Sequence, residues 1–467
     1  MSFPKRFQTV LESLYSLPEN SSYVVAYSGG VDSHVLLHCC KKLSMPVRAV
    51  HVHHGLQSVA DEWVTHCQNI CHTMNISLDV IYVNAQQKRG QSPEEAARSA
   101  RYEALRKNLT HGDCLLTAQH LNDQAETLLL QLFRTASTAG LSAMPAQRQF
   151  GDYVHVRPLL SFSRGDIENY AKENALSWID DPSNQDMSFD RNFIRTNVIP
   201  LLETRWPEIT PQLSTVASLQ ANNLQVLEDM AAIDLANSIK TPLYQSKFCV
   251  YEVISVLAIT ELKHLSYARL LNVLRFWIIK TLASKSSKIS PTRNLLEEIE
   301  KALINARQDA NPVIAFSDVE FRKYQNDLYL LKPKLAKSRD EANIQTAMDW
   351  FPSMPLTIPA LNIQLKAVNR RGKGLQKDLL NKLLTIRFRK GGEKFNPAER
   401  QHSQSLKKLF QEAGVLPWER DMIPLLYFKD ELIAVIGLWV SKKYAVSESE
   451  TGWLIAIENL EYSEPGM

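Results

Sequence analysis

The sequence has few cysteines for its length, and they do not form a metal or redox motif. Six cysteines occur in 467 residues, and no two of them form a Cys-x-x-Cys pair. The spacing therefore argues against a zinc knuckle and a redox dithiol. Cys67 and Cys71 share a predicted helical face with Trp63, Ile70 and Met74, which favours packing in the core.

Long apolar runs and a large excess of one charge are also absent. No stretch approaches the ~18 to 20 apolar residues that cross a bilayer, and the N-terminal segment carries Pro4 and interspersed charges where a signal peptide would be apolar. We therefore expect a cytoplasmic protein without a membrane partner. The formal net charge of +3 does not by itself indicate nucleic-acid binding, but it allows a local basic surface.

A short apolar run followed by two glycines is the first feature with chemical meaning. Residues 24–26 suit a strand buried in a parallel sheet, and Gly29 and Gly30 allow a sharp turn before a helix that begins near Val31. Backbone N–H groups at such a turn, together with the positive end of the helix, favour a bound phosphate. The alternative is an ordinary strand-to-helix turn.

The residues that complete this turn suggest which phosphate chemistry it serves. Asp32 supplies a carboxylate for Mg²⁺, and Ser33 supplies a hydroxyl donor. The stretch lacks the lysine and the spacing of a Gly-x-x-x-x-Gly-Lys-Ser/Thr loop. Ser-Gly-Gly-Val-Asp-Ser instead resembles the pyrophosphatase loop (PP-loop) of enzymes that split ATP between its α and β phosphates. This resemblance implies that a substrate is adenylated.

Five alternations of strand and helix predict the fold of this part of the chain. The expected strands are residues 24–26, 47–52, 78–83, 114–118 and 153–158. The pattern indicates an α/β fold with a doubly wound, five-stranded parallel sheet, in which ligands bind at the carboxyl ends of the strands. His53 and His54 follow the second strand, and we expect them beside the nucleotide rather than in a metal site.

Further polar residues should reach the same edge of the sheet. His120, Asp123 and Gln124 follow the fourth strand and are expected to point into the site. Arg191 and Arg195 stand four apart, so they share a helical face. They could clamp anionic oxygens or form a salt-bridged surface.

An earlier helix carries a second arginine pair. Ser92, Pro93 and Glu95 predict its N-terminus through a cap and capping box. Arg98 and Arg101 stand three apart on one flank of this helix. They could face phosphates or solvent.

The length predicts two or three domains, because a single core rarely grows this large. We expect a catalytic domain at residues 1–215, a mostly helical middle domain at 216–335, and a small α+β domain at 345–467. The last domain is basic and fits phosphate contacts with RNA, although solvated surface charges are the alternative. Its cations include Arg387, Arg389, Lys390, Lys394, Arg400, Lys407 and Lys408.

In combination, these motifs resemble the tRNA(Ile)-lysidine synthetase family over most of the chain. The middle region is only weakly covered. The matching segments are residues 28–33, 51–55, 119–127, 180–184, 191–195, 387–395, 406–410 and 417–420.

The resemblance implies ATP-dependent ligation of L-lysine to C2 of the wobble cytidine of an isoleucine tRNA with a CAU anticodon. AMP and pyrophosphate are released, and decoding changes from AUG to AUA. By this resemblance ATP contacts Ser28, Gly29, Gly30, Val31, Asp32, Ser33 and His53. It also implies ATP and Mg²⁺ as cofactors. It does not decide whether the chain acts as a monomer or as a homodimer.

The resemblance also implies roles for individual side chains. Asp32 holds Mg²⁺, Asp123 is the base or the anchor of the amine, and Arg195 stabilises phosphate charge. Arg191 and the terminal basic residues contact tRNA. Asn122 stands where the family has an aspartate, and an amide is a poorer Mg²⁺ ligand.

Two other enzyme classes share this type of loop. A PP-loop tRNA thiolase would need a sulfur-carrying Cys pair or an iron–sulfur ligand set, and the cysteines here are poorly placed for either. A small-molecule adenylating ligase would have no use for the basic C-terminal domain.

Overall fold

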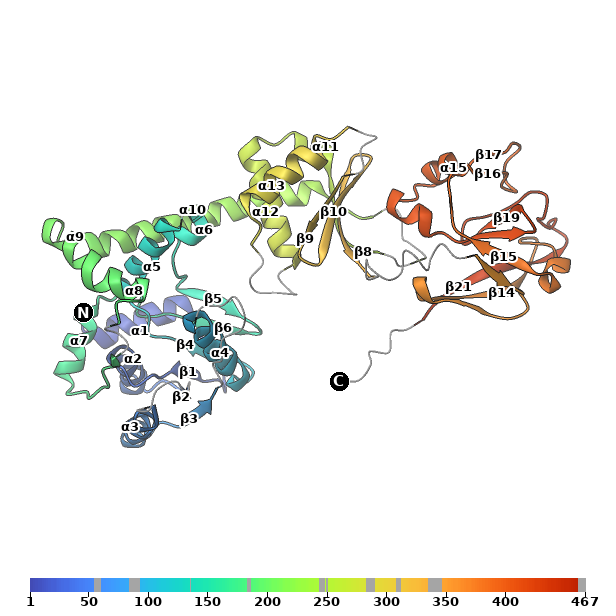
Figure 1. Cartoon of the computed structure of the whole chain (residues 1–467). Helices are drawn as coiled ribbons and strands as arrows, with labels where there is room; N and C mark the ends of the chain where they lie inside the picture. Colours follow the sequence, from blue (N-terminus) through green and yellow to red (C-terminus); the bar gives the residue numbers. More distant parts are fainter. Residues whose placement is uncertain are drawn as a thin grey trace. The chain divides into compact units, whose positions relative to one another are not determined.

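The computed structural model describes most of the chain and divides it into two compact units, Met1–Val226 and Leu227–Met467 (Figure 1). None of the described helices is long and apolar enough to cross a membrane. The described residues are 1–53, 60–83, 93–134, 136–182, 186–242, 248, 251–282, 290–307, 312–334 and 347–460.

The first unit is built on a six-stranded sheet of order β3-β2-β1-β4-β6-β5. The five predicted strands are present and parallel, which confirms the predicted sheet. The sixth strand, β5, was not predicted; it pairs antiparallel with β6 at the edge. The strands are β1 (Tyr23–Ala26), β2 (Val47–His53), β3 (Leu78–Tyr82), β4 (Cys114–Leu116), β5 (Gln147–Phe150) and β6 (Tyr153–Val156).

Helices cover both faces of this sheet, as the doubly wound pattern predicts (Figure 1). Tyr23 and Val25 pack on one face with α1 (Phe3–Leu14), α2 (Val31–Lys42), α3 (Ala60–Thr73) and α7 (Arg164–Glu173). Val24 points to the other face, where it packs with Leu105 and Leu109 at the carboxyl end of α4 (Pro93–Asn108). Cys67 and Cys71 are buried in the first of these cores, as expected.

The helices that follow β4 and β6 carry the polar segments predicted from the sequence. Arg191 lies in a short helix, and Arg195 lies in the π-helical turn that continues it. Such π-turns are rare and often occur at functional sites. The elements are α5 (Leu121–Phe133), α6 (Thr138–Leu141), α8 (Asp190–Phe193), η2 (Ile194–Val198), α9 (Ile199–Arg205) and α10 (Ile209–Ser238).

The first part of the second unit combines helices with an antiparallel sheet of order β7-β8-β11-β10-β9. Leu270, Leu274 and Ile278 are buried on α12 at the predicted helical spacing, but the sheet itself was not predicted. The elements are β7 (Ile239–Lys240), β8 (Tyr251–Ala258), α11 (Ile259–Lys263), α12 (Tyr267–Leu282), α13 (Arg293–Ile299), η3 (Glu300–Ile304), β9 (Val313–Phe316), β10 (Val319–Tyr324) and β11 (Asp327–Pro333).

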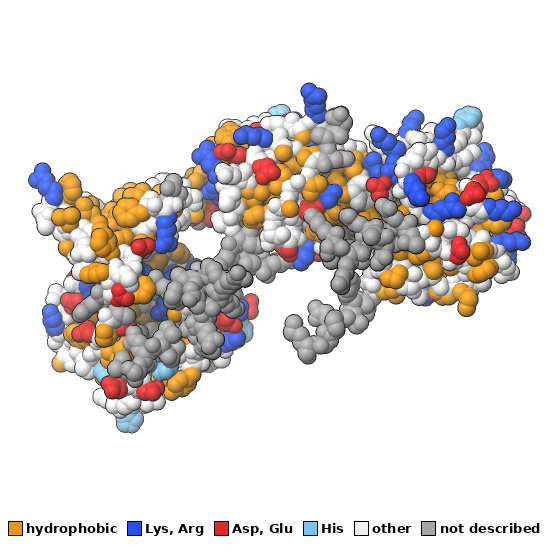
Figure 2. Space-filling model, in the orientation of Figure 1, with side chains coloured by type: hydrophobic (Ala, Val, Ile, Leu, Met, Phe, Trp, Pro, Cys, Tyr) orange, Lys and Arg blue, Asp and Glu red, His pale blue; other side chains and the backbone are white. Residues whose placement is uncertain are grey.

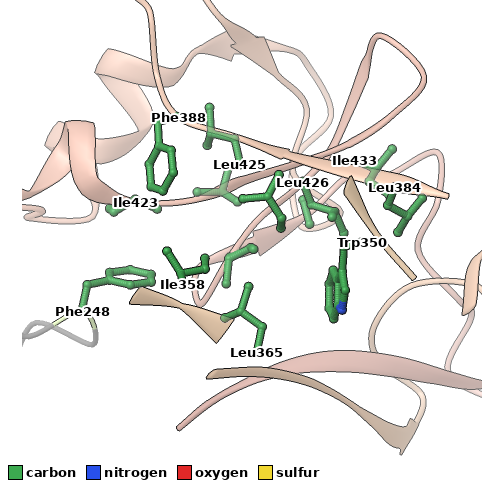
Figure 3. Close-up of a cluster of buried hydrophobic side chains, with 14 of the residues drawn as sticks. Phe248, Trp350, Ile358, Leu365, Leu384, Phe388, Ile423, Leu425, Leu426 and Ile433 are labelled. Carbon is green, nitrogen blue, oxygen red and sulfur yellow. The ribbon is translucent and has the colours of Figure 1, made fainter. Parts of the chain in front are cut away.

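The last part of the chain is α+β, as predicted. A five-stranded sheet and a three-stranded sheet share one apolar core, in which Trp350, Leu365 and Leu425 take part (Figure 3). The strands are β12 (Met348–Trp350), β13 (Leu356–Ile358), β14 (Ile363–Arg371), β15 (Leu384–Arg387), β16 (Lys394–Phe395), β17 (Gln404–Ser405), β18 (Leu425–Phe428), β19 (Glu431–Val435), β20 (Trp439–Val440) and β21 (Thr451–Asn459). The helices are α15 (Leu406–Glu412), η4 (Pro359–Leu361), η5 (Lys377–Asn381) and η6 (Pro417–Met422).

Candidate active site

The loop between β1 and α2 is held by hydrogen bonds of its own side chains. The Ser33 hydroxyl donates to the Gly30 carbonyl at 3.0 Å and accepts from the Ser28 N–H at 3.2 Å. The Ser28 and Ser33 hydroxyl oxygens are also 3.0 Å apart. Ser33 therefore braces the loop, and its donation to a phosphate stays a prediction.

Gly29 occupies a position that only glycine fits easily. Its φ of +87° lies in the left-handed region, and a Cβ there would lie 3.1 Å from Cys67 Sγ and 3.2 Å from Ile179 Cδ1. The Ile179 N–H donates to the Gly29 carbonyl at 3.0 Å. The segment after α7 is thus tied directly to the loop.

Asp32, in the first turn of α2, faces a mixed set of charges. Its Oδ2 accepts from Arg164 Nη1 at 3.2 Å, and its Oδ1 lies 3.8 Å from His120 Nε2. Burial raises the pKa of Asp32, while His120 and Arg164 oppose that rise. Arg164 was not predicted from the sequence, because it belongs to none of the motifs described above.

A buried network of two carboxylates and two arginines lies beside Asp32. Glu126 accepts from Arg191 Nε at 2.7 Å, from Arg195 Nε at 2.6 Å and from Arg195 Nη2 at 2.9 Å. Asp123 Oδ1 lies 3.2 Å from Nη2 of each arginine. Glu126 is only 1% exposed, so water cannot stabilise its negative charge. The positive charges of the two arginines compensate most of it instead. The three-residue spacing of Asp123 and Glu126 could have indicated this pairing.

The surroundings of Asp123 keep its carboxylate ionised. Burial alone would raise the pKa of Asp123, but His120, Arg191, Arg195 and the His120 backbone N–H together lower it. That N–H donates to Asp123 Oδ2 at 3.0 Å. A carboxylate with a lowered pKa is a weaker base and a better partner for a cation.

Asp32 fits a Mg²⁺ ion whose other ligands are phosphates and water. Its Oδ1 is buried and accepts no hydrogen bond from the residues that the structure describes. Among the same residues, no group of three or more His, Cys, Asp or Glu side chains is arranged to hold a metal. Mg²⁺ commonly binds through one or two carboxylates and substrate phosphates, which matches this donor set.

Two polar side chains that were predicted to face the nucleotide site, Gln124 and His53, have partners within the protein. Gln124 was predicted to point into the site, and this is wrong: its amide donates to the Met144 carbonyl at 2.7 Å and accepts from the Met144 N–H at 2.8 Å. His53 does lie at the carboxyl end of β2, with Nε2 3.3 Å from Asp61 Oδ1. Its contact with ATP stays a prediction. His54 and Asn184 lie outside the described residues.

Comparison with known proteins assigns the family. The PP-loop domain family matches residues 3–202, the TilS substrate binding domain matches 257–329, and the TilS substrate C-terminal domain matches 384–458. A tRNA(Ile)-lysidine synthase of Coxiella burnetii is 36% identical over 97% of this chain and 96% of its own. That of Methylococcus capsulatus is 40% identical over 92% and 94%. The chain belongs to the tRNA(Ile)-lysidine synthase family.

A likeness to solved structures is weaker. The U34-tRNA thiolase NcsA from Methanococcus maripaludis aligns with 46% of this chain and 78% of its own, with a TM-score of 0.39 and 15% sequence identity.

The C-terminal region of this lysidine synthase family member carries the predicted basic residues. Figure 2 shows lysine and arginine side chains on the part of the surface that carries α15, β16 and β17. Arg387 pairs with Asp430 at 3.2 Å, and Arg389 pairs with Asp421 at 2.9 Å. These two arginines are therefore partly neutralised, a result that the local sequence did not predict.

The lysines of this region are more available. Lys408 lies 3.9 Å from Glu412, at the limit of an ion pair. Lys390, Lys394 and Lys407 are exposed and make no ion pair with another described residue. They are the best candidates for contacts with RNA phosphates in this lysidine synthase.

Proposed function

We propose that this chain ligates L-lysine to C2 of the wobble cytidine of tRNA(Ile) at the expense of ATP, in the cytoplasm. The observation that carries the proposal is the juxtaposition, at the carboxyl edge of a PP-loop sheet, of the loop, Asp32 and the Asp123–Glu126–Arg191–Arg195 network. The nearly full-length match to tRNA(Ile)-lysidine synthases supports it.

The first step activates the base. The oxygen on C2 of the cytosine attacks the α-phosphorus of ATP, and the bond to pyrophosphate breaks. The loop at residues 28–33 binds the pyrophosphate through its N–H groups and the helix end. Asp32 would hold Mg²⁺, which neutralises phosphate charge when bound.

Arg195 is placed to stabilise the charge that develops in this step. Its Nε and Nη2 bond to Glu126 and Asp123, which fixes the plane of the guanidinium group. Its Nη1 makes no hydrogen bond with any residue that the structure describes, so it is free to donate to a phosphate oxygen.

The second step joins the amino acid. The neutral side-chain amine of lysine attacks C2 of the adenylated base, the C2–O bond breaks, and AMP leaves with that oxygen. Free lysine has a pKa of ~10.4, so the attacking amine must first lose a proton to solvent, and the nitrogen loses a second proton to solvent after it has bonded to C2. Asp123 binds an ammonium group of lysine and orients the molecule, in keeping with its persistent negative charge.

Selection of the tRNA requires contacts away from the anticodon. A methionine tRNA can present the same CAU triplet, so reading only these bases would not separate the two. Lys390, Lys394 and Lys407 are exposed and free of ion pairs with described residues, and we assign them to the phosphate backbone of tRNA.

The test incubates the full chain with labelled lysine, ATP and tRNA(Ile) transcript. We expect alkali-stable label on the RNA together with AMP and pyrophosphate, and no label on a methionine tRNA. Asp123→Asn should raise the lysine KM, and Asp32→Ala should abolish AMP formation. Label that mild base removes as an ester would contradict the proposal. Sedimentation of the same sample decides between monomer and homodimer.

A further inference from the structure

Four arginines surround one tyrosine near the carboxyl ends of β4 and β6. The guanidinium carbons of Arg98, Arg101 and Arg148 lie 5.3, 5.7 and 5.3 Å from the centre of the Tyr102 ring. Arg157 follows β6 directly and is 1% exposed. None of the four forms an ion pair with an acidic residue within the described part of the chain. We call these four residues the arginine cluster.

A neutral histidine, His155, contacts two members of the arginine cluster. His155 Nδ1 accepts from Arg148 Nε at 3.1 Å and lies 3.4 Å from Arg157 Nη2. Its Nε2 therefore carries the proton, and it donates to Thr117 Oγ1 at 2.7 Å. Burial and the neighbouring arginines lower the pKa of His155 to about 2. The ring is thus an uncharged acceptor that positions the arginines.

The arginine cluster is electrostatically incomplete. Arg157 donates through Nη1 to the Pro145 carbonyl at 2.7 Å, but its Nε is buried without a partner among the described residues. Burial lowers the pKa of Arg157 to about 10; Tyr102 opposes this effect, and Arg148 and Arg98 add to it. Burial also lowers the pKa of Arg101 and Arg148. Like charges held together in this way favour a bound anion.

The arginine cluster adjoins the proposed active site. Arg191, which binds Glu126, is close enough to add to the repulsion that lowers the pKa of Arg101. Thr117 also donates to Gln119, which directly precedes the N-cap of α5. The cluster extends from buried Arg157 to Arg98, which is exposed to solvent. An extended anion can therefore reach it from outside.

We propose that the arginine cluster binds backbone phosphates of the RNA beside the nucleotide that is modified. The inference rests on the proposed function. A lone carboxylate would be satisfied by one bidentate guanidinium group, whereas four cations that run from the interior to the surface match successive phosphates. Unpaired RNA bases also stack on guanidinium planes, so exposed arginines beside the phosphate contacts suit single-stranded RNA.

The first test measures RNA binding directly, without ATP or lysine, so it does not depend on catalysis. Arg98→Gln and Arg148→Gln should each weaken binding of an anticodon stem-loop by about tenfold. Each should also reduce the slope of log K against log salt by about 0.7, the value for one single-strand phosphate. The control is Arg106→Gln. Arg106 is exposed at the carboxyl end of α4, the helix that carries Arg98, and its replacement should leave the affinity and the salt slope unchanged.

The second test identifies the ligand group. Neutral methylphosphonate linkages are placed one at a time through the anticodon loop. The penalty of Arg148→Gln should disappear at the linkage that the side chain contacts, and Arg148→Lys should restore part of the salt slope. Unchanged RNA binding in both glutamine variants would overturn the proposal. So would a raised lysine KM with normal RNA binding, because the anion would then be the lysine carboxylate.

Discussion

Replacing Gly29 by alanine tests whether the loop geometry is required by the fold. A side chain at φ +87° costs about 1 to 2 kcal/mol. The added Cβ would also lie 3.1 Å from Cys67 Sγ and 3.2 Å from Ile179 Cδ1, and such overpacking costs about 1 to 3 kcal/mol. We expect a total near 3 kcal/mol, which corresponds to a Tm lower by about 6 to 12 °C for a unit of this size.

Gly30→Ala is the matched control one residue along the same loop. Gly30 has a φ of −76°, and its nearest neighbour to an added Cβ is Ser28 Oγ at 3.6 Å, so alanine fits without strain. We expect an unchanged Tm but a raised ATP KM, because the methyl group would crowd the phosphate. Calorimetry of the full chain, following the transition that ATP raises, measures both variants. Equal Tm values for Gly29→Ala and Gly30→Ala would refute the reasoning.

Three further predictions concern buried and exposed charges. Glu126→Gln should lower the free energy of unfolding by about 3 kcal/mol, since Arg191 and Arg195 lose their short charged bonds to Glu126 and keep only Asp123; an unchanged denaturation midpoint would contradict this. Although burial raises the pKa of Asp113, bonds from Arg48 and Thr110 lower it overall, so its contribution is present above the unfolded pKa near 3.8 and is lost in acid. Asp113→Asn should therefore cost about 2 kcal/mol at neutral pH, and a pH series of unfolding should show the difference from wild type shrinking below about pH 4. Lys390→Ala with Lys407→Ala should weaken tRNA binding and its salt dependence in filter-binding assays, whereas an equal loss in a variant of an unrelated exposed lysine would argue for nonspecific charge.

The sequence predicts the parallel strands because each is a local, mostly apolar run, and that of β1 is continuous. Val24 and Val25 point to opposite faces of the sheet, and both faces are covered, so the whole run is apolar. The strand β5 was not predicted because it has no apolar run: three of its four residues, Gln147, Arg148 and Gln149, are polar. An edge strand is held by one neighbour, and its side chains need not alternate in polarity.

Site residues can be predicted from the sequence when their spacing places them on one face of a helix. They cannot be predicted when they meet through contacts between distant parts of the chain. Arg191 and Arg195 were expected to share a face because they stand four apart, and they do converge on Glu126. Arg164 reaches Asp32 from 132 residues away, so no local pattern records the pair. The ion pairs of Arg387 and Arg389 in the C-terminal region also join acids distant in the sequence, so no local pattern predicts them, and the contacts of these arginines with tRNA stay a prediction.

The two arginine groups of the first unit differ in the partners that the chain gives them. Arg191 and Arg195 have buried carboxylates as partners, so their positions are fixed without a ligand, and of these carboxylates Asp123 is the one we propose to bind the ammonium group of lysine. The arginine cluster around Tyr102 forms no ion pair with an acid among the described residues, which is why we propose an anion as its ligand. The two arginine groups would therefore attract ligands of opposite charge. Raising the salt concentration should weaken RNA binding more steeply than lysine binding, because several RNA phosphates each release counterions.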